Sequence, residues 1–360
     1  MISTIEPLGE IIEAQLGQWP QGSALAGKAV NVLLEAAFFG QRGMQRRRPV
    51  IAGDGTPILL SFQEDGRGQT PPFRLLTEPG LSSLSVSEQI DFSLRTLDRL
   101  LSDLCWSGCA GVANDVVRAL FPSRADAVDS WWGGMGIGLS LDTIGLELRI
   151  YCNVREGDVP RRWSRIVAVL AQFGATAASD APLRAFIERT SPHAVPAGLA
   201  LCMREGRPFG IRIYLSVSQP DADAICSLGA LDIGAKLAVA GICNAYPTVR
   251  PFTYGCVTVA YDFPFAIEQL YIDPIPVRFK ADFDCTPHPQ QPCGDRETMA
   301  LWLAARHSEL GLPSDRMRAF LADIQRACGG YATDYVSFGW RRGAPEITTY
   351  VLPSGYATLP

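Results

Sequence analysis

The feature that most constrains the fold of this chain is a short pattern, a polar residue two positions before a tyrosine, that recurs along it. Residues i and i+2 of a β-strand point to the same face, so each polar residue should share a face with its tyrosine. The stretches are 57 to 79 residues apart, which is too irregular for a solenoid and fits a supersecondary unit with insertions. Three stretches are complete, the first keeps only its arginine, and the last keeps only its tyrosine. In chain order they contain Arg74, Arg149/Tyr151, Arg212/Tyr214, Gln269/Tyr271 and Tyr350.

Each of these stretches falls on the second strand of a predicted β-hairpin. Period-two alternation predicts hairpins of residues 57–62 with 72–78, 136–142 with 145–153, 197–204 with 208–217, 256–263 with 265–273, and 334–341 with 346–352. Helical periodicity fills the intervals, at residues 24–40, 88–104, 114–120, 161–173, 182–188, 221–245, 295–310 and 314–327. This alternation does not follow the β-α-β order of a parallel sheet.

Ten antiparallel strands separated by helices predict an α+β fold, in which a closed antiparallel β-barrel is surrounded by a ring of helices. A ten-stranded barrel has a lumen wide enough to hold a ligand. The alternative is an open antiparallel sheet covered by helices. Such a sheet needs an apolar face against the helices, which the repeated polar residues do not supply. We expect one domain over residues 1–360, with a helical N-terminal segment at 1–50 and the repeated units at 55–353.

The composition excludes several classes of function. The chain has 360 residues, 47% of them hydrophobic, which suits one large domain or two ordinary ones. Its net charge of −5 gives no overall attraction to nucleic acid or to an anionic membrane. We expect a cytoplasmic protein, because no apolar run reaches the length of a membrane span and the N-terminus lacks a signal-peptide pattern. Ten scattered cysteines without a CxxC pair predict buried, reduced thiols, and the three histidines lack zinc-ligand spacing.

Arginines at equivalent strand positions predict an anion site inside the barrel. Arg74, Arg149 and Arg212 would repel one another in one cavity unless an anion lay between them. Planar guanidinium groups match phosphate oxygens, and Gln269 adds a hydrogen-bond donor without adding charge. The pattern therefore predicts a site for a polyanion such as diphosphate.

The tyrosines predict an aromatic layer next to the anion site, because they lie two residues further along their strands. Electron-rich aromatic faces stabilise a cation by roughly 0.5–2 kcal/mol each. Departure of a diphosphate beside such a layer indicates ionisation of an allylic diphosphate, with the resulting carbocation kept from water. The predicted layer contains Tyr151, Tyr214, Tyr271 and Tyr350.

Several segments resemble, in the same order, the motifs of one enzyme family. The strand Pro57–Ser61 is followed by an arginine-bearing strand that ends in Glu-Pro, Phe73–Pro79. The Arg-x-Tyr and Gln-x-Tyr stretches come next, and the chain closes with Tyr335–Phe338 and a final strand that carries Tyr350. This ordered set resembles the aromatic prenyltransferases of the ABBA or PT-barrel fold, and within them the dimethylallyltryptophan synthase branch.

The resemblance implies transfer of a dimethylallyl or longer prenyl group from its diphosphate to an electron-rich aromatic acceptor, indole-derived or phenolic, by Friedel–Crafts alkylation. The absence of an (N/D)DxxD motif implies that arginines replace metal ions, so that no cofactor is required and Mg²⁺ is at most an enhancer. The diphosphate ligands would be Arg74, Arg149, Arg212 and Gln269. The shield around the carbocation would be Tyr151, Tyr214, Tyr271, Tyr335 and Tyr350.

Two positions depart from the family pattern, and both concern the acceptor. Leu59 stands where the family has a glutamate that holds the indole N–H, and Gly138 stands where tryptophan C4-type enzymes have a lysine base. Glu147 shares a face with Arg149 and is the candidate base or acceptor anchor, unless it only forms an ion pair with that arginine. Weaker candidates for the base are Asp142 and Asp282.

Two alternatives are left open by these departures. A peptide-modifying prenyltransferase would use the same barrel, open at one end, to act on a side chain of a cyclic or longer peptide. A non-catalytic barrel would bind a phosphorylated or hydrophobic ligand without turnover. For either kind of prenyltransferase, the partners are a prenyl diphosphate and an aromatic small molecule or a peptide. None of the three hypotheses involves nucleic acid or a membrane.

Overall fold

The computed structural model describes residues 2–19, 22–38, 58–66, 72–79, 86–121, 135–174, 177–217, 222–229, 231, 236–237, 239–240, 257–265, 278–284, 296–341 and 343–354. The strands are β1 Ile58–Glu64, β2 Phe73–Thr77, β3 Met135–Asp142, β4 Gly145–Asn153, β5 Ala194–Arg204, β6 Arg207–Val217, β7 Val257–Pro264, β8 Arg278–Asp284, β9 Tyr331–Arg341 and β10 Ala344–Pro353. The α-helices are α1 Ile2–Leu16, α2 Ser23–Phe38, α3 Val86–Asp103, α4 Ala110–Leu120, α5 Val159–Gln172, α6 Ala177–Thr190, α7 Ala222–Gly229, α9 Arg296–Glu309 and α10 Asp315–Cys328, and a short 3-10 helix, η1, covers Ser107–Cys109.

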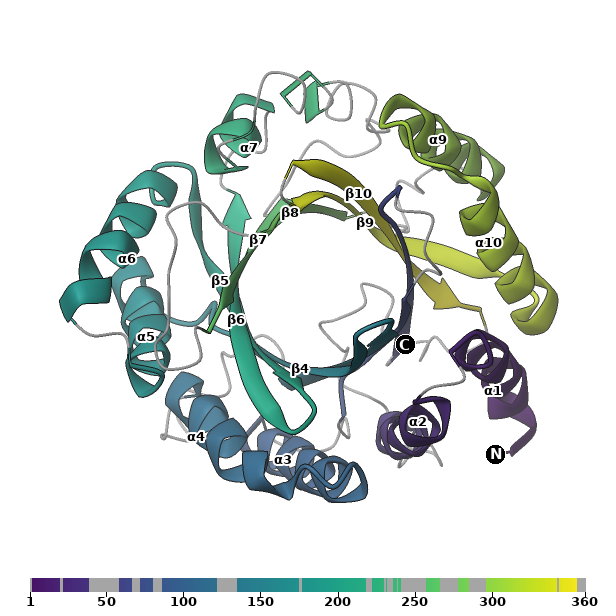
Figure 1. Cartoon of the computed structure of the whole chain (residues 1–360), viewed down its shortest axis with the longest axis horizontal. Coiled ribbons are helices and arrows are strands. Elements are labelled where there is room, and N and C mark those ends of the chain that lie inside the picture. Colours follow the sequence, from purple (N-terminus) through teal and green to yellow (C-terminus); the bar gives the residue numbers. More distant parts are fainter. Residues whose placement is uncertain are drawn as a thin grey trace.

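The strands β1 to β10 close into one antiparallel barrel, in which each strand pairs with the next along the chain and β10 pairs back to β1. Figure 1 shows this barrel as a ring of strands inside a ring of helices. Closure leaves no free sheet edge. The predicted barrel is therefore confirmed, and the alternative of an open sheet is wrong.

Alternation along each strand separates the outer wall of the barrel from its lumen. In β8, Phe279, Ala281 and Phe283 belong to the apolar core beneath the helices. Arg278 and Lys280, which alternate with these residues, are almost fully buried as well, but on the opposite face of the strand, which is the lumen. Because a slip of one residue would place these charges against the helices, the alternation also fixes the register of the strand.

The two N-terminal helices complete the outer ring. Helix α1 contacts α10 from the far end of the chain, and α2 contacts α3, β2 and β3. In Figure 1 the purple α1 and α2 fill the arc between α10 and α3. Ala29, Leu33 and Ala37 lie four residues apart on α2 and are fully buried, as expected for the apolar face of a helix. Within the described ranges, no helix combines the length and the apolarity needed to cross a bilayer.

Two predicted elements differ from the structure. Strand β7 pairs with β8, with Tyr261 opposite Phe279, so the prediction of residues 265–273 as the partner strand is wrong. That prediction assumed the short connection typical of hairpins, whereas β8 begins only at Arg278. The predicted helix 221–245 is also wrong as a single element, because α7 ends at Gly229 and Leu231 is not helical.

The docking of α6 against β7 depends on one aromatic side chain. Phe186 is fully buried and makes edge-to-face contacts with Tyr261 and Phe263 at centroid distances of 4.9 and 5.2 Å, and with Trp163 at 6.1 Å. Such pairs contribute about 0.5–1.5 kcal/mol each beyond the area that they bury. Phe186 therefore ties two helices, α5 and α6, to one strand.

We predict that Phe186→Ala lowers the free energy of unfolding by about 3–5 kcal/mol, because it leaves a cavity where three rings meet. Phe186→Leu should cost less than half as much, since most of the volume remains. Chemical denaturation followed by circular dichroism measures both. A loss smaller than about 1 kcal/mol for the alanine variant would show that α6 contributes little to the fold.

Candidate functional site

One end of the lumen is a cavity of about 430 Å³, called the guanidinium cavity below. The arginines that line it are Arg74, Arg149, Arg204, Arg212, Arg278 and Arg341. The carboxylates among them are Asp65, Asp142, Glu147, Asp262 and Glu346. Among the described residues, the arginines of this cavity exceed its carboxylates by one, so most of their charge is balanced by the protein itself.

Two of the predicted arginines are paired with carboxylates of the cavity wall. Arg212 donates to Asp262 through both Nε and Nη2, with Nη2 2.7 Å from Oδ2. Arg149 donates to Glu147 on its own strand, and Arg204 Nη2 lies 2.9 Å from the same carboxylate. Pairing of this kind offsets the desolvation that burial imposes on each charge. Both predicted arginines still have N–H groups left for a ligand, because a guanidinium has five donors.

A third pair, between Arg278 and Glu346, is almost fully buried and lies next to the first, with Arg278 Nη1 3.9 Å from Asp262 Oδ2. Arg278 donates to Glu346, and its Nη2 also donates to Gln63 Oε1 at 3.2 Å. Gln63 Nε2 donates in turn to Glu346 Oε2 at 3.2 Å, which closes a triangle between β1, β8 and β10. Arg341 Nε lies 3.7 Å from the same glutamate. This triangle fixes the wall of the cavity and leaves little of Glu346 for a ligand.

Arg74 differs from the other arginines because no carboxylate pairs with it among the described residues. Its Nε is inaccessible to solvent and has no hydrogen-bond partner there. Burial, together with the charges of Arg149 and Arg278, lowers the pKa of Arg74 to about 10. The group is still a cation at neutral pH, and an anion in the cavity would satisfy its donors.

The other end of the lumen is a cavity of about 240 Å³, called the aromatic cavity below. Tyr151 and Tyr214 form one wall with ring centroids 5.9 Å apart, and Tyr335 and Tyr350 form another with centroids 6.4 Å apart at an interplanar angle of 89°. Burial raises the pKa of Tyr214 well above its usual value, so this ring is a neutral phenol. The structure thus brings four of the five predicted shield tyrosines together.

An apolar wall completes the aromatic cavity. Leu59 and Leu352 form a small cluster with Leu76 that is separate from the main core of the protein. Leu59 and Leu76 both line the cavity. The position where the family resemblance places a glutamate is therefore an apolar part of the cavity wall.

Small residues on β3, β5 and β7 make room for large inward side chains on the neighbouring strands β4 and β6. Arg149 lies opposite Gly138, and Tyr214 lies opposite Gly198 and Ala260. At Gly138 a Cβ atom would lie only 2.8 Å from Tyr151 Cε2, closer than real contacts allow. A lysine at this position would therefore require Tyr151 to move.

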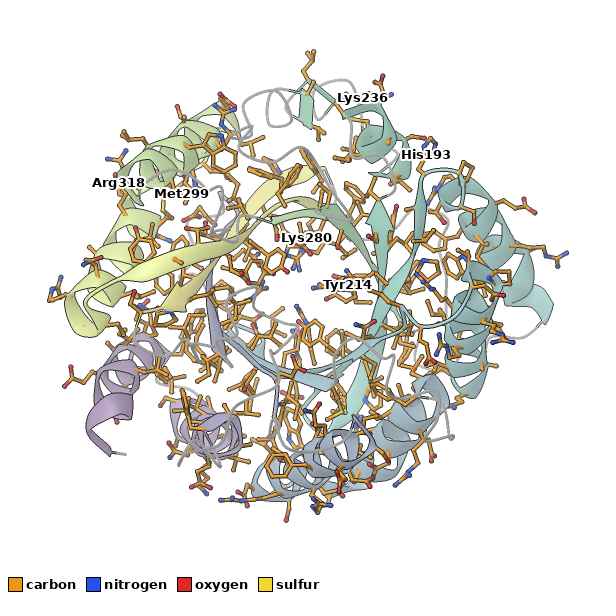
Figure 2. The ribbon with its side chains drawn as sticks, turned by 180° about the vertical axis from the view of Figure 1, so that it is seen from behind. His193, Tyr214, Lys236, Lys280, Met299 and Arg318 are labelled. Carbon is orange, nitrogen blue, oxygen red and sulfur yellow. The ribbon has the colours of Figure 1, made fainter. Side chains whose placement is uncertain are left out.

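The side chains of the site form two levels along the barrel axis, one of arginines and one of tyrosines, and the register of the strands places residues of β8 at both. Tyr151 lies across Ala200 from Arg212, two residues before Tyr214. In the same way, Tyr214 lies across Ala260 from Lys280, two residues before Asp282. A constant offset of this kind follows the tilt of the strands in a barrel. Lys280 therefore belongs to the level of Arg149 and Arg212, and Asp282 to the level of the tyrosines. Figure 2 shows Lys280 and Tyr214 inside the ring of strands.

Lys280 connects the two levels through a buried network. Its Nζ donates to Tyr350 Oη and lies 3.1 Å from Asp282 Oδ1, and Ser337 Oγ donates to the same carboxylate oxygen. Burial alone would raise the pKa of Tyr350, but the neighbouring Lys280 lowers it overall. The tyrosine level thus includes Tyr350, whose hydroxyl is bound by Lys280, and the carboxylate of Asp282.

The predicted site residues divide between the two cavities. Arg74, Arg149 and Arg212 share the guanidinium cavity, as predicted. Glu147 lies in that cavity as well, bound to two arginines, and does not line the aromatic cavity; the alternative of an ion pair with Arg149 is observed. Gln269 and Tyr271 lie outside the described residues, and the strand predicted to carry them is not the partner of β7.

Sequence reasoning missed Arg278, Lys280 and the two carboxylates Asp262 and Glu346. A signal for the first two was present, because residues 278–284 alternate charged and apolar side chains with strict period two. Asp262 and Glu346 meet arginines that are 50 and 68 residues away in the sequence, so no local pattern marks the carboxylates. Across the described ranges, no group of three or more His, Cys, Asp or Glu side chains is placed to hold a metal ion.

The fold is shared with solved aromatic prenyltransferases. The chain is similar to 5-dimethylallyltryptophan synthase from Streptomyces coelicolor, with 18% identity, a TM-score of 0.72 and 98% of each chain covered. It is also similar to 6-dimethylallyltryptophan synthase from Micromonospora olivasterospora in complex with DMASPP and Trp, with 15% identity, a TM-score of 0.68 and coverage of 97% of this chain and 98% of that one. AnaPT from Neosartorya fischeri shows 14% identity, a TM-score of 0.61 and coverage of 98% and 93%. No protein-family model and no curated protein sequence matches the chain.

The buried ion pairs predict a loss of stability in acid. Burial would raise the pKa of Asp262, Glu147 and Glu346, but their arginine partners outweigh it and lower each pKa below its ordinary value of 3.8 or 4.5. Groups with a lowered pKa in the folded state stabilise it fully above the unfolded-state pKa, and this contribution is lost as the pH falls. We expect the free energy of unfolding to decrease from about pH 5 downward, by up to about 1.4 kcal/mol per pH unit for each such group.

Equilibrium denaturation between about pH 5 and pH 3 measures this slope. Asp262→Asn should make the slope shallower, whereas Asp323→Asn, which removes an exposed carboxylate on α10, should leave it unchanged. Equal slopes for the wild type and Asp262→Asn would contradict the linkage.

Proposed function

We propose that this chain is an aromatic prenyltransferase, which moves a dimethylallyl or longer prenyl group from an allylic diphosphate to an electron-rich aromatic acceptor. The observation that carries the proposal is the adjacency of a cationic level and a tyrosine level on the same strands of one closed barrel. The fold shared with dimethylallyltryptophan synthases over nearly the whole chain supports the same function.

The guanidinium cavity provides the donor half of the site. Arg74, Arg149, Arg212 and Lys280 present cations at one level, of which Arg74 alone has no pairing partner among the described residues. Lys280 takes the place that the repeated pattern predicted for Gln269. As the bond between prenyl C1 and the diphosphate oxygen breaks, its electron pair moves to the diphosphate, and these donors stabilise the growing negative charge.

The aromatic cavity provides the acceptor half of the site. Tyr151, Tyr214, Tyr335 and Tyr350 surround the allylic cation, exclude water and stabilise the positive charge with their ring faces. A π-electron pair of the acceptor then forms the new C–C bond, and loss of the ring proton restores aromaticity. The neighbour solved with DMASPP and Trp makes L-tryptophan the first acceptor to test.

The defining experiment measures diphosphate release and product mass with dimethylallyl diphosphate and a panel of acceptors. The panel contains L-tryptophan, indole, L-tyrosine and a cyclic dipeptide that includes tryptophan. We expect release that depends on the acceptor. Donor binding without release for any acceptor would instead identify a non-catalytic barrel, and turnover with the peptide alone would identify a peptide-modifying enzyme.

We predict that Arg74→Met weakens the binding of inorganic diphosphate by about 10- to 100-fold, the value of one charge-assisted hydrogen bond or more. The free energy of unfolding should not decrease, because no carboxylate loses a partner. Arg212→Met is the matched comparison: it leaves Asp262 buried without its bidentate partner and should lower both affinity and stability. Calorimetric titration and chemical denaturation measure the two effects. Unchanged diphosphate affinity in Arg74→Met would remove Arg74 from the donor site.

We also predict that turnover persists in excess EDTA, because arginine and lysine side chains supply the positive charge that a metal ion would otherwise provide. Added Mg²⁺ should raise the rate at most modestly. Complete loss of activity in EDTA that is restored by Mg²⁺ would contradict this prediction.

A further inference from the structure

Electrophilic substitution requires a group that removes the ring proton, and the aromatic cavity contains a carboxylate at the level of its tyrosines. Of the described residues, two acids line this cavity, Glu78 and Asp282. The register places Asp282 at the level of Tyr214, two residues beyond Lys280. Glu78 lies four residues beyond Arg74, one level further from the donor. Asp282 is thus the acid next to the place where the prenyl cation would meet the acceptor.

The hydrogen bonds of Asp282 leave one of its oxygens free for a substrate. Oδ1 is held by Lys280 Nζ at 3.1 Å and by the hydroxyl of Ser337. Among the described residues, none donates a hydrogen bond to Oδ2. The side chain is 16% exposed and lines the cavity, so Oδ2 is the atom available on that side. A carboxylate that is fixed through one oxygen and open at the other has the geometry of a positioned proton acceptor.

Other groups near the site are less suited to the task. Tyr214 is a neutral phenol whose pKa is raised by burial. Tyr350 already accepts a hydrogen bond from Lys280, and a phenol has to lose its own proton before it can take another. Glu147 is bound to Arg149 and Arg204 in the guanidinium cavity and does not line the aromatic one. Gly138 has no side chain, and Leu59 is apolar.

We propose that Asp282 is the catalytic base of the reaction and that its Oδ2 takes the ring proton after the C–C bond has formed. This inference rests on the proposed function. In the step, the C–H bond at the alkylated ring carbon breaks, its electron pair returns to the ring, and the proton passes to Oδ2 and later to solvent. Lys280 and Ser337 are positioning residues, because they hold Oδ1 and do not touch the reacting carbon.

The test compares Asp282→Asn with the wild type, using dimethylallyl diphosphate with L-tryptophan and with ring-deuterated L-tryptophan, or with whichever acceptor of the panel the wild type prenylates. We expect Asp282→Asn to reduce prenylated product by about 100-fold or more. A primary deuterium isotope effect on the ring C–H should appear in the variant and be absent or smaller in the wild type, because proton removal becomes the slow step. Affinity for inorganic diphosphate should remain within about threefold, since no donor of the cationic level is removed.

Further variants separate a chemical role of Asp282 from a structural one. Asp282→Glu keeps the carboxylate and should recover part of the rate with a smaller isotope effect than Asp282→Asn. Glu78→Gln should show no new isotope effect. Asp323→Asn removes an exposed carboxylate that lies 3.1 Å from Arg326, the same distance as in the Asp282–Lys280 pair, and should behave as wild type.

The outcomes distinguish this inference from the proposed function. A wild type that turns over no acceptor of the panel contradicts both. An active wild type together with an Asp282→Asn variant of equal rate, or of lower rate without an isotope effect, overturns only the role of Asp282. The same holds if the new isotope effect appears in Glu78→Gln instead. If Asp282→Asn does not fold, Asp282→Ser, which also lacks a base, decides the question. Loss of product in a folded Asp282→Ser sustains the proposal, and the wild-type rate in that variant overturns it. A folded Asp282→Glu with wild-type rate and an unchanged isotope effect shows only that the position requires a negative charge.

Discussion

Compensation of charge inside the barrel is the constraint on which the site depends. Guanidinium groups taken out of water are tolerated only when carboxylates or a ligand meet them. Arg212 pairs with Asp262 on the adjacent strand, and Arg278 pairs with Glu346 two strands away, beyond β9. Each pair fixes an arginine in place without using all its donors. What remains for a ligand is a set of oriented N–H groups, together with Arg74, for which the described residues offer no partner.

Alternation of large and small side chains around the barrel leaves space in the lumen, where a ligand can reach these charges. Strands β4 and β6 carry cations and tyrosines and β8 carries Lys280, whereas β3 and β7 place the small residues Gly138 and Ala260 opposite Arg149 and Lys280. The lumen therefore stays open between facing walls, with cationic side chains at one level and aromatic side chains at the next. The same crowding means that a side chain at Gly138 would displace Tyr151 from its place in the wall.

β8 shows where pattern-based prediction fails. Residues 265–273 follow β7 closely in the sequence and carry a Gln-x-Tyr pair, and both features favour them as its partner strand. The strand that pairs with β7 begins at Arg278 and carries a lysine and an aspartate at the corresponding levels. Strand pairing depends on contacts with both neighbours, β7 and β9, and residues far apart in the chain decide it. Local periodicity alone could not choose between two strand-like segments, although the charged alternation in 278–284 was a usable signal.

The alternation of hairpins with helices and the shared face of Arg149 with Tyr151 and of Arg212 with Tyr214 were readable from the sequence, because period-two alternation is a local property of the backbone. The closed barrel followed from the number of strands and their inward polar residues, whereas the second strand of the fourth hairpin was predicted wrongly. Tertiary structure alone decided which carboxylate meets which arginine, that Leu59 faces the aromatic cavity, and that Asp282 stands among the tyrosines. These facts depend on the register and tilt of strands that are distant in the sequence. Neither quantity is encoded within any single strand, because both are set by closure of the whole barrel.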